Sequence, residues 1–137
     1  MQNVWAIFRN CDWAGFEKIY LTWCSPTPPR NEISKTALWG ENTINWEYYS
    51  SSLEVVWELQ KNWFKIYSIE LSDLAIDYKK LFGNTPENIC FVLWNEVKWV
   101  DSNLLDISDE IVMIPMLGKK ESLNVSVAAG IVMYATV

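Results

Sequence analysis

The chain has 137 residues, half of them hydrophobic, which is enough for one domain with its own core. Its net charge of −6 argues against nucleic-acid binding through overall charge, although net charge does not prevent a local basic patch. Three irregularly spaced cysteines and the absence of histidine argue against a disulfide framework, a zinc site and histidine-based triads, and favour a reducing cytoplasm. No apolar run reaches bilayer length and no signal peptide is recognisable, so we expect no membrane as a partner. The cysteine spacing and the absence of histidine likewise lead us to expect no metal.

Apolar periodicity and turn residues predict an alternation of helices and strands along the chain. We expect helices at 3–14, 31–38, about 52–62, 101–105 and 123–135. We expect strands at 17–22, 64–69, 87–93 and 109–114, a loop or edge segment at 45–49, and an irregular segment with a helical turn at 71–81. The proline-rich run at 25–29 is expected to be an extended loop. This alternation predicts a single α/β domain with a parallel sheet, helices on both faces and a site at the strand carboxyl ends.

The segment from Glu110 to Gly130 has the form of a strand, a polar loop and a helix. Pro115 cannot donate to a sheet ladder and should end the strand, and Ser122 is a suitable N-cap for the helix. That helix is apolar nearly all round, which predicts burial in the core or in a dimer interface. Its N-terminus could seat a carboxylate or a phosphate, but a purely structural role is the commoner meaning of such a segment.

Three stretches, in order, resemble the motifs of one family. The sequence IPMLGKKESLNVSVAAGIVMY at 114–134 resembles the third motif of the SpoU/TrmH-type RNA 2′-O-methyltransferases of the SPOUT superfamily. Residues 3–12, NVWAIFRNCD, resemble the first motif, and residues 91–100, FVLWNEVKWV, resemble the second. The resemblance therefore extends over nearly the whole chain.

The resemblance implies a SPOUT α/β knot, in which the last helix passes through a loop to form a deep trefoil. It also implies a homodimer and a cofactor pocket at the knot. Family members place a core strand just before the first motif, so we expect this chain to be N-terminally short, with its first strand missing. No appended RNA-binding domain is recognisable in residues 1–137, so the dimer itself would have to hold the RNA.

The implied reaction is the transfer of a methyl group from S-adenosylmethionine to a ribose 2′-hydroxyl of tRNA or rRNA. The implied catalytic positions are Arg9, Asn3 and Glu96. The implied cofactor-binding positions are Leu93, Trp94, Asn95, Glu96, Trp99, Ile114, Met116, Ser122, Leu123 and Asn124. Arg9, Lys119 and Lys120 are expected to contact RNA phosphates. A guanidinium keeps its proton far above neutral pH, so we expect Arg9 to bind phosphate and orient the ribose rather than act as the base.

Nine tryptophans against five glycines is an unusual ratio for such a domain. Several tryptophans stand where the family pattern or the local structure calls for glycine. These positions are Trp5, Trp13, Trp23, Trp39, Trp63, Trp94 and Trp99. Trp63, for example, follows a predicted helix end, where a left-handed glycine is expected. Our hypothesis is that most of these residues are glycine codons translated with the wrong genetic code, and the alternative is real divergence in a degraded or inactive protein.

Two functions remain open from the sequence. The first is the RNA 2′-O-methyltransferase, which is favoured by the presence of Arg9, Glu96, Ser122 and Asn124. The second is a non-catalytic RNA-binding or assembly module that keeps the fold but not the pocket. The acidic balance, the missing strand and tryptophan at positions 94 and 99 favour the second.

Overall fold

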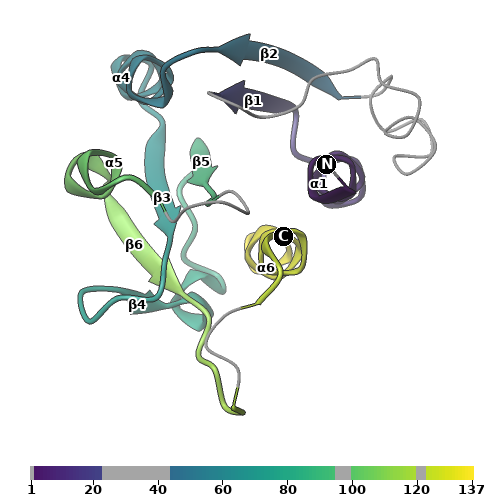
Figure 1. Cartoon of the computed structure of the whole chain (residues 1–137), viewed down its shortest axis with the longest axis vertical. Helices are drawn as coiled ribbons and strands as arrows, with labels where there is room; N and C mark the ends of the chain where they lie inside the picture. Colours follow the sequence, from purple (N-terminus) through teal and green to yellow (C-terminus); the bar gives the residue numbers. More distant parts are fainter. Residues whose placement is uncertain (1, 23–43, 95–99, 120–122) are drawn as a thin grey trace.

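The computed structural model describes residues 2–22, 44–94, 100–119 and 123–137 (Figure 1). Its elements are, in chain order, α1 (Gln2–Ala14), β1 (Lys18–Thr22), β2 (Asn45–Tyr49), α4 (Ser52–Lys61), β3 (Lys65–Ile69), β4 (Ile76–Asp77), the 3₁₀ helix η1 (Tyr78–Leu81), β5 (Ile89–Val92), α5 (Ser102–Ile107), β6 (Glu110–Met113) and α6 (Val125–Tyr134). The predicted elements that fall on described residues are therefore confirmed to within a few residues. The loop at 25–29 and the helix at 31–38 lie outside the described residues.

All strand pairings among the described residues are parallel, but the strands form two sheets instead of the expected single sheet. One sheet has the order β1-β2, and the other has the order β4-β6-β3-β5. The segment at 45–49, expected as a loop or edge, is the strand β2, paired with β1 from Asn45 opposite Lys18 to Tyr49 opposite Thr22. The segment at 71–81 supplies the short edge strand β4 and the turn η1.

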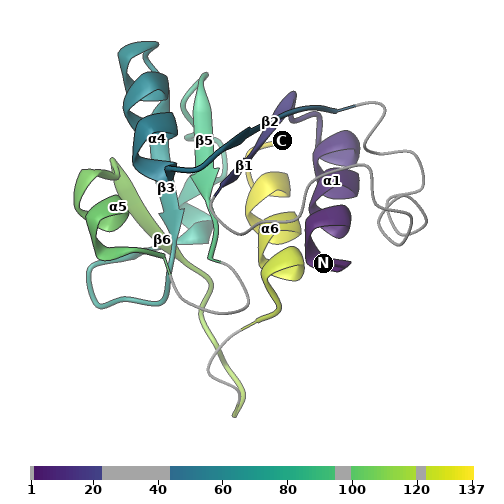
Figure 2. The same cartoon turned by 45° about the horizontal axis from the view of Figure 1, so that its top comes forward.

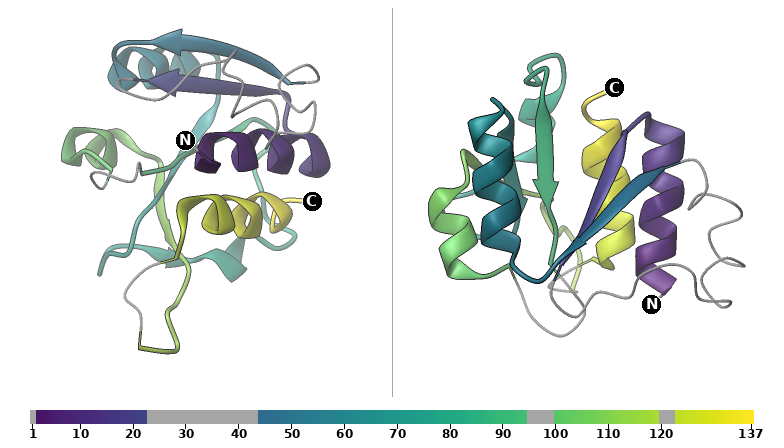
Figure 3. Two further views of the ribbon diagram at one scale, coloured as in Figure 1. Left: turned by 45° about the vertical axis from the view of Figure 1, so that its right-hand side comes forward. Right: turned by 90° about the horizontal axis from the view of Figure 1, so that it is seen from above.

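Helices cover both faces of the strands (Figures 1 and 3). Helices α4 and α5 pack on one face, and α1 and α6 lie side by side on the other. The α4–α5 cluster is formed by the buried residues Val55, Val56, Leu59, Ile66, Val100 and Leu104. The α1–α6 cluster is formed by Trp5, Phe8, Cys11, Leu21, Ile44, Ala129 and Met133. A third, the β6–α6 cluster, is formed by Ile69, Leu81, Val112, Val132 and Ala135.

The ends of the helices follow local sequence signals. The sequence offers Ser51 and Ser52 as caps for α4, and it is the Ser51 side chain that accepts a hydrogen bond from the Glu54 N–H, at 3.4 Å. Trp63, just beyond the other end of α4, has the predicted left-handed conformation, with φ +68°. Trp13, which we expected in the turn between the first helix and the next strand, lies inside α1, and the left-handed residue at that helix end is Gly15, with φ +80°.

Helix α6 begins later than predicted. Its N-cap is Asn124, whose side chain accepts a hydrogen bond from the Ser126 N–H at 2.9 Å, and its first residue is Val125. Asn124 is the N-cap because its amide oxygen reaches the N–H of the second helical residue, and asparagine is as good an N-cap residue as serine. Ser122, the predicted cap, lies outside the described residues. Within the part of the chain that the structure covers, no helix combines the length and apolar character needed to traverse a bilayer.

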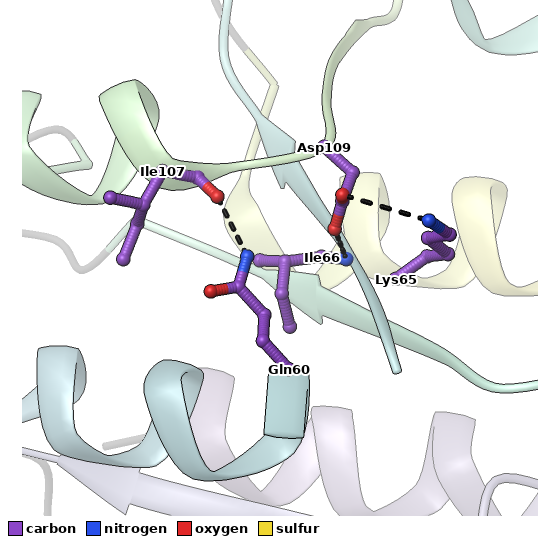
Figure 4. Close-up of polar contacts among 5 residues, drawn as sticks. All are labelled: Gln60, Lys65, Ile66, Ile107 and Asp109. Atoms are coloured by element: carbon purple, nitrogen blue, oxygen red, sulfur yellow. Dashed lines mark hydrogen bonds and ion pairs between the residues drawn. The ribbon is translucent and has the colours of Figure 1, made fainter. Parts of the chain in front are cut away.

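A polar network joins the layers where β3 begins (Figure 4). Gln60 donates from Nε2 to the Ile107 carbonyl at 2.8 Å, which ties the end of α4 to the end of α5. Asp109 accepts the Ile66 N–H at 2.7 Å through Oδ2, and its own N–H donates to the Ile66 carbonyl at 2.8 Å. Lys65 lies 4.0 Å from Asp109 Oδ1 on the exposed side of the network. Asp109 therefore extends the pairing between β3 and β6 by one residue before the start of β6.

We expect Asp109→Ala to destabilise the fold by about 1–3 kcal/mol, because the Ile66 N–H would lose its acceptor in a largely buried place. Asp109→Asn retains an acceptor oxygen and should lose less. Asp106→Ala, an exposed change at the end of α5, is the control and should stay within about 0.5 kcal/mol. The measurement is urea unfolding of the three variants beside the parent chain. Equal stability for the Asp109→Ala and Asp106→Ala variants would contradict the assignment.

Candidate functional site

The carboxyl ends of β3, β5 and β6 meet at one edge of the four-stranded sheet, because these strands are parallel and adjacent. Glu70 follows β3, Leu93 and Trp94 follow β5, and Ile114 follows β6. Leu93, Trp94 and Ile114 are half-buried and pack against the same β6–α6 cluster. The structure thus brings together the second and third motifs, as the resemblance implies.

The first motif reaches this edge through the packing of α1 against α6 (Figure 2). Asn10 donates from Nδ2 to the Ser126 carbonyl at 2.9 Å, in the first turn of α6. A Cβ on Gly130 would lie 3.6 Å from the Asn10 side chain, an ordinary van der Waals distance, so α1 and α6 are closely packed at this point. Asn10 lies within the first motif but was not singled out from the sequence. An asparagine on an otherwise apolar helix face is the signal that could have found it.

Arg9 is half-buried on α1, next to Asn10. Its Nε is buried and has no hydrogen-bond partner among the described residues. Its guanidinium carbon lies 5.8 Å from the centre of the Trp13 ring, within the range of a cation–π contact. The planar, charged guanidinium of an arginine is suited to binding an oxyanion such as a phosphate.

The remaining predicted site residues divide between described and undescribed parts of the chain. Asn3 is half-buried in the first turn of α1. Met116 and Leu123 are half-buried on either side of the loop before α6, and Lys119 is exposed on that loop. Asn124 is exposed and its side chain caps α6, which gives it a structural role of its own. Outside the described residues lie Asn95, Glu96, Trp99, Lys120 and Ser122.

Glu70 is a residue at this edge that sequence reasoning missed. Its Oε2 accepts the Val100 N–H at 3.1 Å, at the place where the chain returns from the second motif. Burial raises the pKa of this carboxyl, and the N–H groups of Val100 and Leu71 partly oppose the rise. A carboxylate directly after a buried strand, at the carboxyl edge of a parallel sheet, is the signal that could have found it.

Other chemistry is sparse in the described part of the chain. No group of three or more histidine, cysteine, aspartate or glutamate side chains there could hold a metal ion. Cys11 and Cys90 are unpaired, and burial raises the pKa of each thiol to about 12, so neither is a ready nucleophile at neutral pH. The Lys18 ammonium forms an ion pair with the Glu47 carboxylate at 2.9 Å, so its positive charge is partly neutralised within the chain.

Comparison with known proteins agrees with this arrangement. The sequence profile of the SpoU rRNA Methylase family matches residues 1–134. The tRNA (guanosine(18)-2′-O)-methyltransferase of Escherichia coli strain K12 is 26% identical over 132 residues, which are 96% of this chain and 56% of that protein. The Aquifex aeolicus protein of the same name is 29% identical over 133 residues, covering 96% of this chain and 61% of that one. The chain thus spans little more than half the length of these relatives.

Solved structures give the same fold. The A. aeolicus TrmH/SpoU tRNA modifying enzyme superposes with a TM-score of 0.86 and 26% identity, over 98% of this chain and 67% of that one. The AdoMet-bound rRNA methyltransferase from Sinorhizobium meliloti superposes with a TM-score of 0.87 and 20% identity, over 98% of this chain and 51% of that one. The second similarity bears on the fold alone.

The raised pKa of Glu70 predicts a pH effect on stability. A carboxyl whose pKa is raised by folding favours the folded state at low pH, and that advantage is lost as pH rises through the raised pKa. We therefore expect the stability of the parent chain relative to Glu70→Gln to fall as pH rises from the ordinary carboxyl range. Urea unfolding at stepped pH measures this difference, with Glu58→Gln on the exposed face of α4 as the control. A difference that grows with pH would contradict the prediction.

Proposed function

The chain belongs to the SpoU rRNA Methylase family, and we propose that it methylates a ribose 2′-hydroxyl in tRNA or rRNA with S-adenosylmethionine as the methyl donor. The observation that carries this proposal is the meeting of its three motifs at one edge of the sheet. The Asn10–Ser126 contact joins the first and third motifs, and the shared packing of Leu93, Trp94 and Ile114 joins the second and third.

The described residues fit S-adenosylmethionine in kind. Leu93, Ile114, Met116 and Leu123 offer half-buried apolar side chains and backbone groups, which suit an uncharged adenosine. A Cβ on Gly118 would meet nothing within 4 Å, so the loop backbone is open to a ligand there. We propose that the cofactor is bound by Leu93, Ile114, Met116 and Leu123 together with Asn95, Glu96, Trp99, Ser122 and Asn124. When bound, the cofactor supplies an electrophilic methyl group.

We assign Arg9 to the RNA. Its guanidinium stays charged at neutral pH, so it binds a phosphate and orients the ribose rather than removing the proton from the 2′-hydroxyl. Holding the reacting oxygen in line with the methyl group is a large part of the catalysis that such a transfer needs. Asn3 and Glu96 are proposed to act at the same centre, and Lys119 and Lys120 to contact RNA phosphates.

Trp94 favours a second candidate, a non-catalytic RNA-binding or assembly module. Its side chain is half-buried and packs against both the α4–α5 cluster and the β6–α6 cluster. At this position a bulky side chain takes space that a glycine would leave for a ligand near the backbone. Binding of S-adenosylmethionine discriminates the two candidates, because the module is expected to bind RNA without binding the cofactor.

We also propose that a further strand lies between β1 and β5. Each of these strands has one edge without a partner among the described residues. Their faces nevertheless match: Ile19 and Phe91 pack against the α1–α6 cluster, while Tyr20 and Cys90 pack against the α4–α5 cluster. Such alternation is expected of strands in one continuous sheet. One parallel strand, supplied by residues before position 1, would join the two sheets and restore the expected fold.

The proposal includes the trefoil knot, a homodimer and a cytoplasmic location. The last helix supports the dimer, since α6 contributes to two clusters through Ala129 and Val132 yet leaves Val127 and Tyr134 half exposed. An apolar helix with exposed valine and tyrosine side chains is suited to a partner subunit. The unpaired thiols of Cys11 and Cys90 support a reducing compartment.

The first experiment tests methyl transfer. The chain is incubated with methyl-labelled S-adenosylmethionine and with total tRNA or rRNA, and label is expected in alkali-resistant dinucleotides, which mark a 2′-O-methyl group. Arg9→Ala should reduce the rate by roughly 100-fold or more, because the ribose is no longer held in line, while cofactor affinity is retained. Lys61→Ala, an exposed change at the end of α4, is the control. Cofactor binding without transfer in the parent chain, or full activity of Arg9→Ala, would contradict these roles.

The second experiment tests the additional strand. Amide hydrogen exchange in β1 and β5 is expected to slow when the protein is produced with the residues encoded upstream of position 1, because a new strand would pair with their free edges. Strand β3, which is already paired on both sides, is the internal control. Unchanged exchange in β1 and β5 in the longer protein would count against the strand.

A further inference from the structure

Three described residues have a left-handed backbone, and one of them is a tryptophan. Gly15 has φ +80°, Gly83 has φ +68°, and Trp63 has φ +68°. In this conformation the Cβ of an L-residue crowds the neighbouring carbonyl oxygen, whereas glycine has no Cβ. Large side chains are therefore rare at such positions, and Trp63 is an outlier against the other two.

The hydrogen bonds at this helix end require the left-handed conformation. The Trp63 N–H donates to the Gln60 carbonyl at 3.1 Å, and the Phe64 N–H donates to the Leu59 carbonyl at 3.0 Å. These two bonds form a Schellman motif, in which Trp63 occupies the position that is most often glycine. Helix α1 closes in a related way, with the Phe16 N–H donating to the Cys11 carbonyl at 2.8 Å across Gly15.

No contact among the described residues offsets this conformation at Trp63. Its side chain is 85% exposed, so it gains almost no burial in return for the unfavourable backbone. Phe64, the next residue, already supplies the hydrophobic contact of the motif by packing against the α4–α5 cluster that contains Leu59. The local structure therefore requires the backbone freedom of glycine at position 63 and makes no use of an indole there.

Trp5 is a second and independent anomaly. It is fully buried between α1 and α6, stacked on Phe8 with ring centres 5.3 Å apart. Its indole N–H is buried and has no hydrogen-bond partner among the described residues. A buried indole normally finds an acceptor, because an unmet donor carries its full desolvation penalty.

Other tryptophans of the same chain have ordinary environments. Trp46 lies in β2 and packs against the α1–α6 cluster, and Trp57 lies on α4 with half of its surface exposed. Neither has a left-handed backbone, and neither has a buried nitrogen without a partner. The anomaly therefore belongs to particular positions and not to tryptophan in this chain as a whole.

We propose that residues 5 and 63 are glycine in the protein made by its own cells. UGA is read as tryptophan in some genetic codes and as glycine in others, so a gene that uses UGA for glycine acquires tryptophan at those codons when the other code is applied. Positions 46 and 57, where tryptophan fits, would carry UGG. The inference depends on backbone geometry and burial, so it stands apart from the methyltransferase proposal.

The test is the codons of the gene together with peptide mass mapping of the protein from its native cells. Glycine at 5 and 63, with UGA codons there and tryptophan at 46 and 57, is the expected result. Tryptophan in the native peptide at position 63 or at position 5 would overturn the proposal, whatever the outcome of the methylation assay.

A recombinant pair tests the physical premise. Trp63→Gly should lower the unfolding equilibrium constant by about tenfold, because it removes the strained Cβ and leaves the Schellman hydrogen bonds intact. Trp57→Gly is the matched control on the same helix and should raise that constant, because glycine is unfavourable inside a helix. Destabilisation by Trp63→Gly similar to that by Trp57→Gly would overturn the premise.

Discussion

The close packing of α1 against α6 is the contact on which the candidate site depends. The small residues Ala128, Ala129 and Gly130 let the two helices approach, and Asn10 uses that proximity to reach the Ser126 carbonyl. Because α6 also packs over the β6–α6 cluster, it connects the first motif to the ends of β5 and β6. A Cβ at position 130 would lie in van der Waals contact with the Asn10 side chain, so a side chain that extends past Cβ would press on this contact.

Local signals predicted most of the fold, and the remainder depends on contacts between distant residues. The cap at Ser51 and the left-handed position 63 are encoded within a few residues of each helix end, so both could be predicted. The order of the strands within each sheet could not, because it depends on which strand edges meet. The same holds for Glu70, whose bond to Val100 joins residues 30 apart in the chain. Ser122 was the predicted cap and Asn124 is the observed one. Both residue types are good N-caps, so the sequence alone does not select between them.

The negative charge of the chain bears on the RNA binding that we propose. With a net charge of −6, attraction to phosphates has to come from a few fixed groups instead of from the overall field. Lys18 is unavailable because it pairs with Glu47, whereas Arg9 keeps a buried Nε without a partner among the described residues. The guanidinium carbon of Arg9 lies 5.8 Å from the centre of the Trp13 ring, and any ordering from this contact would reduce the entropy lost on binding a phosphate. Recognition of this kind favours specificity over general affinity for nucleic acid.

Residue 94 bears both on the proposed methyltransferase function and on the proposal that certain tryptophans are natively glycine, although neither proposal depends on the other. In the chain as given, the Trp94 side chain packs between the α4–α5 and β6–α6 clusters and so supports the core at the end of β5. Glycine there would forfeit that packing, which is unfavourable for the fold, but it would open the backbone to a ligand, which is favourable for a cofactor site. Stability alone therefore cannot decide what stands at position 94. At position 63 glycine relieves backbone strain and sacrifices no packing, so the identity of that residue shows which genetic code applies, and the codon at position 94, read with that code, then determines residue 94.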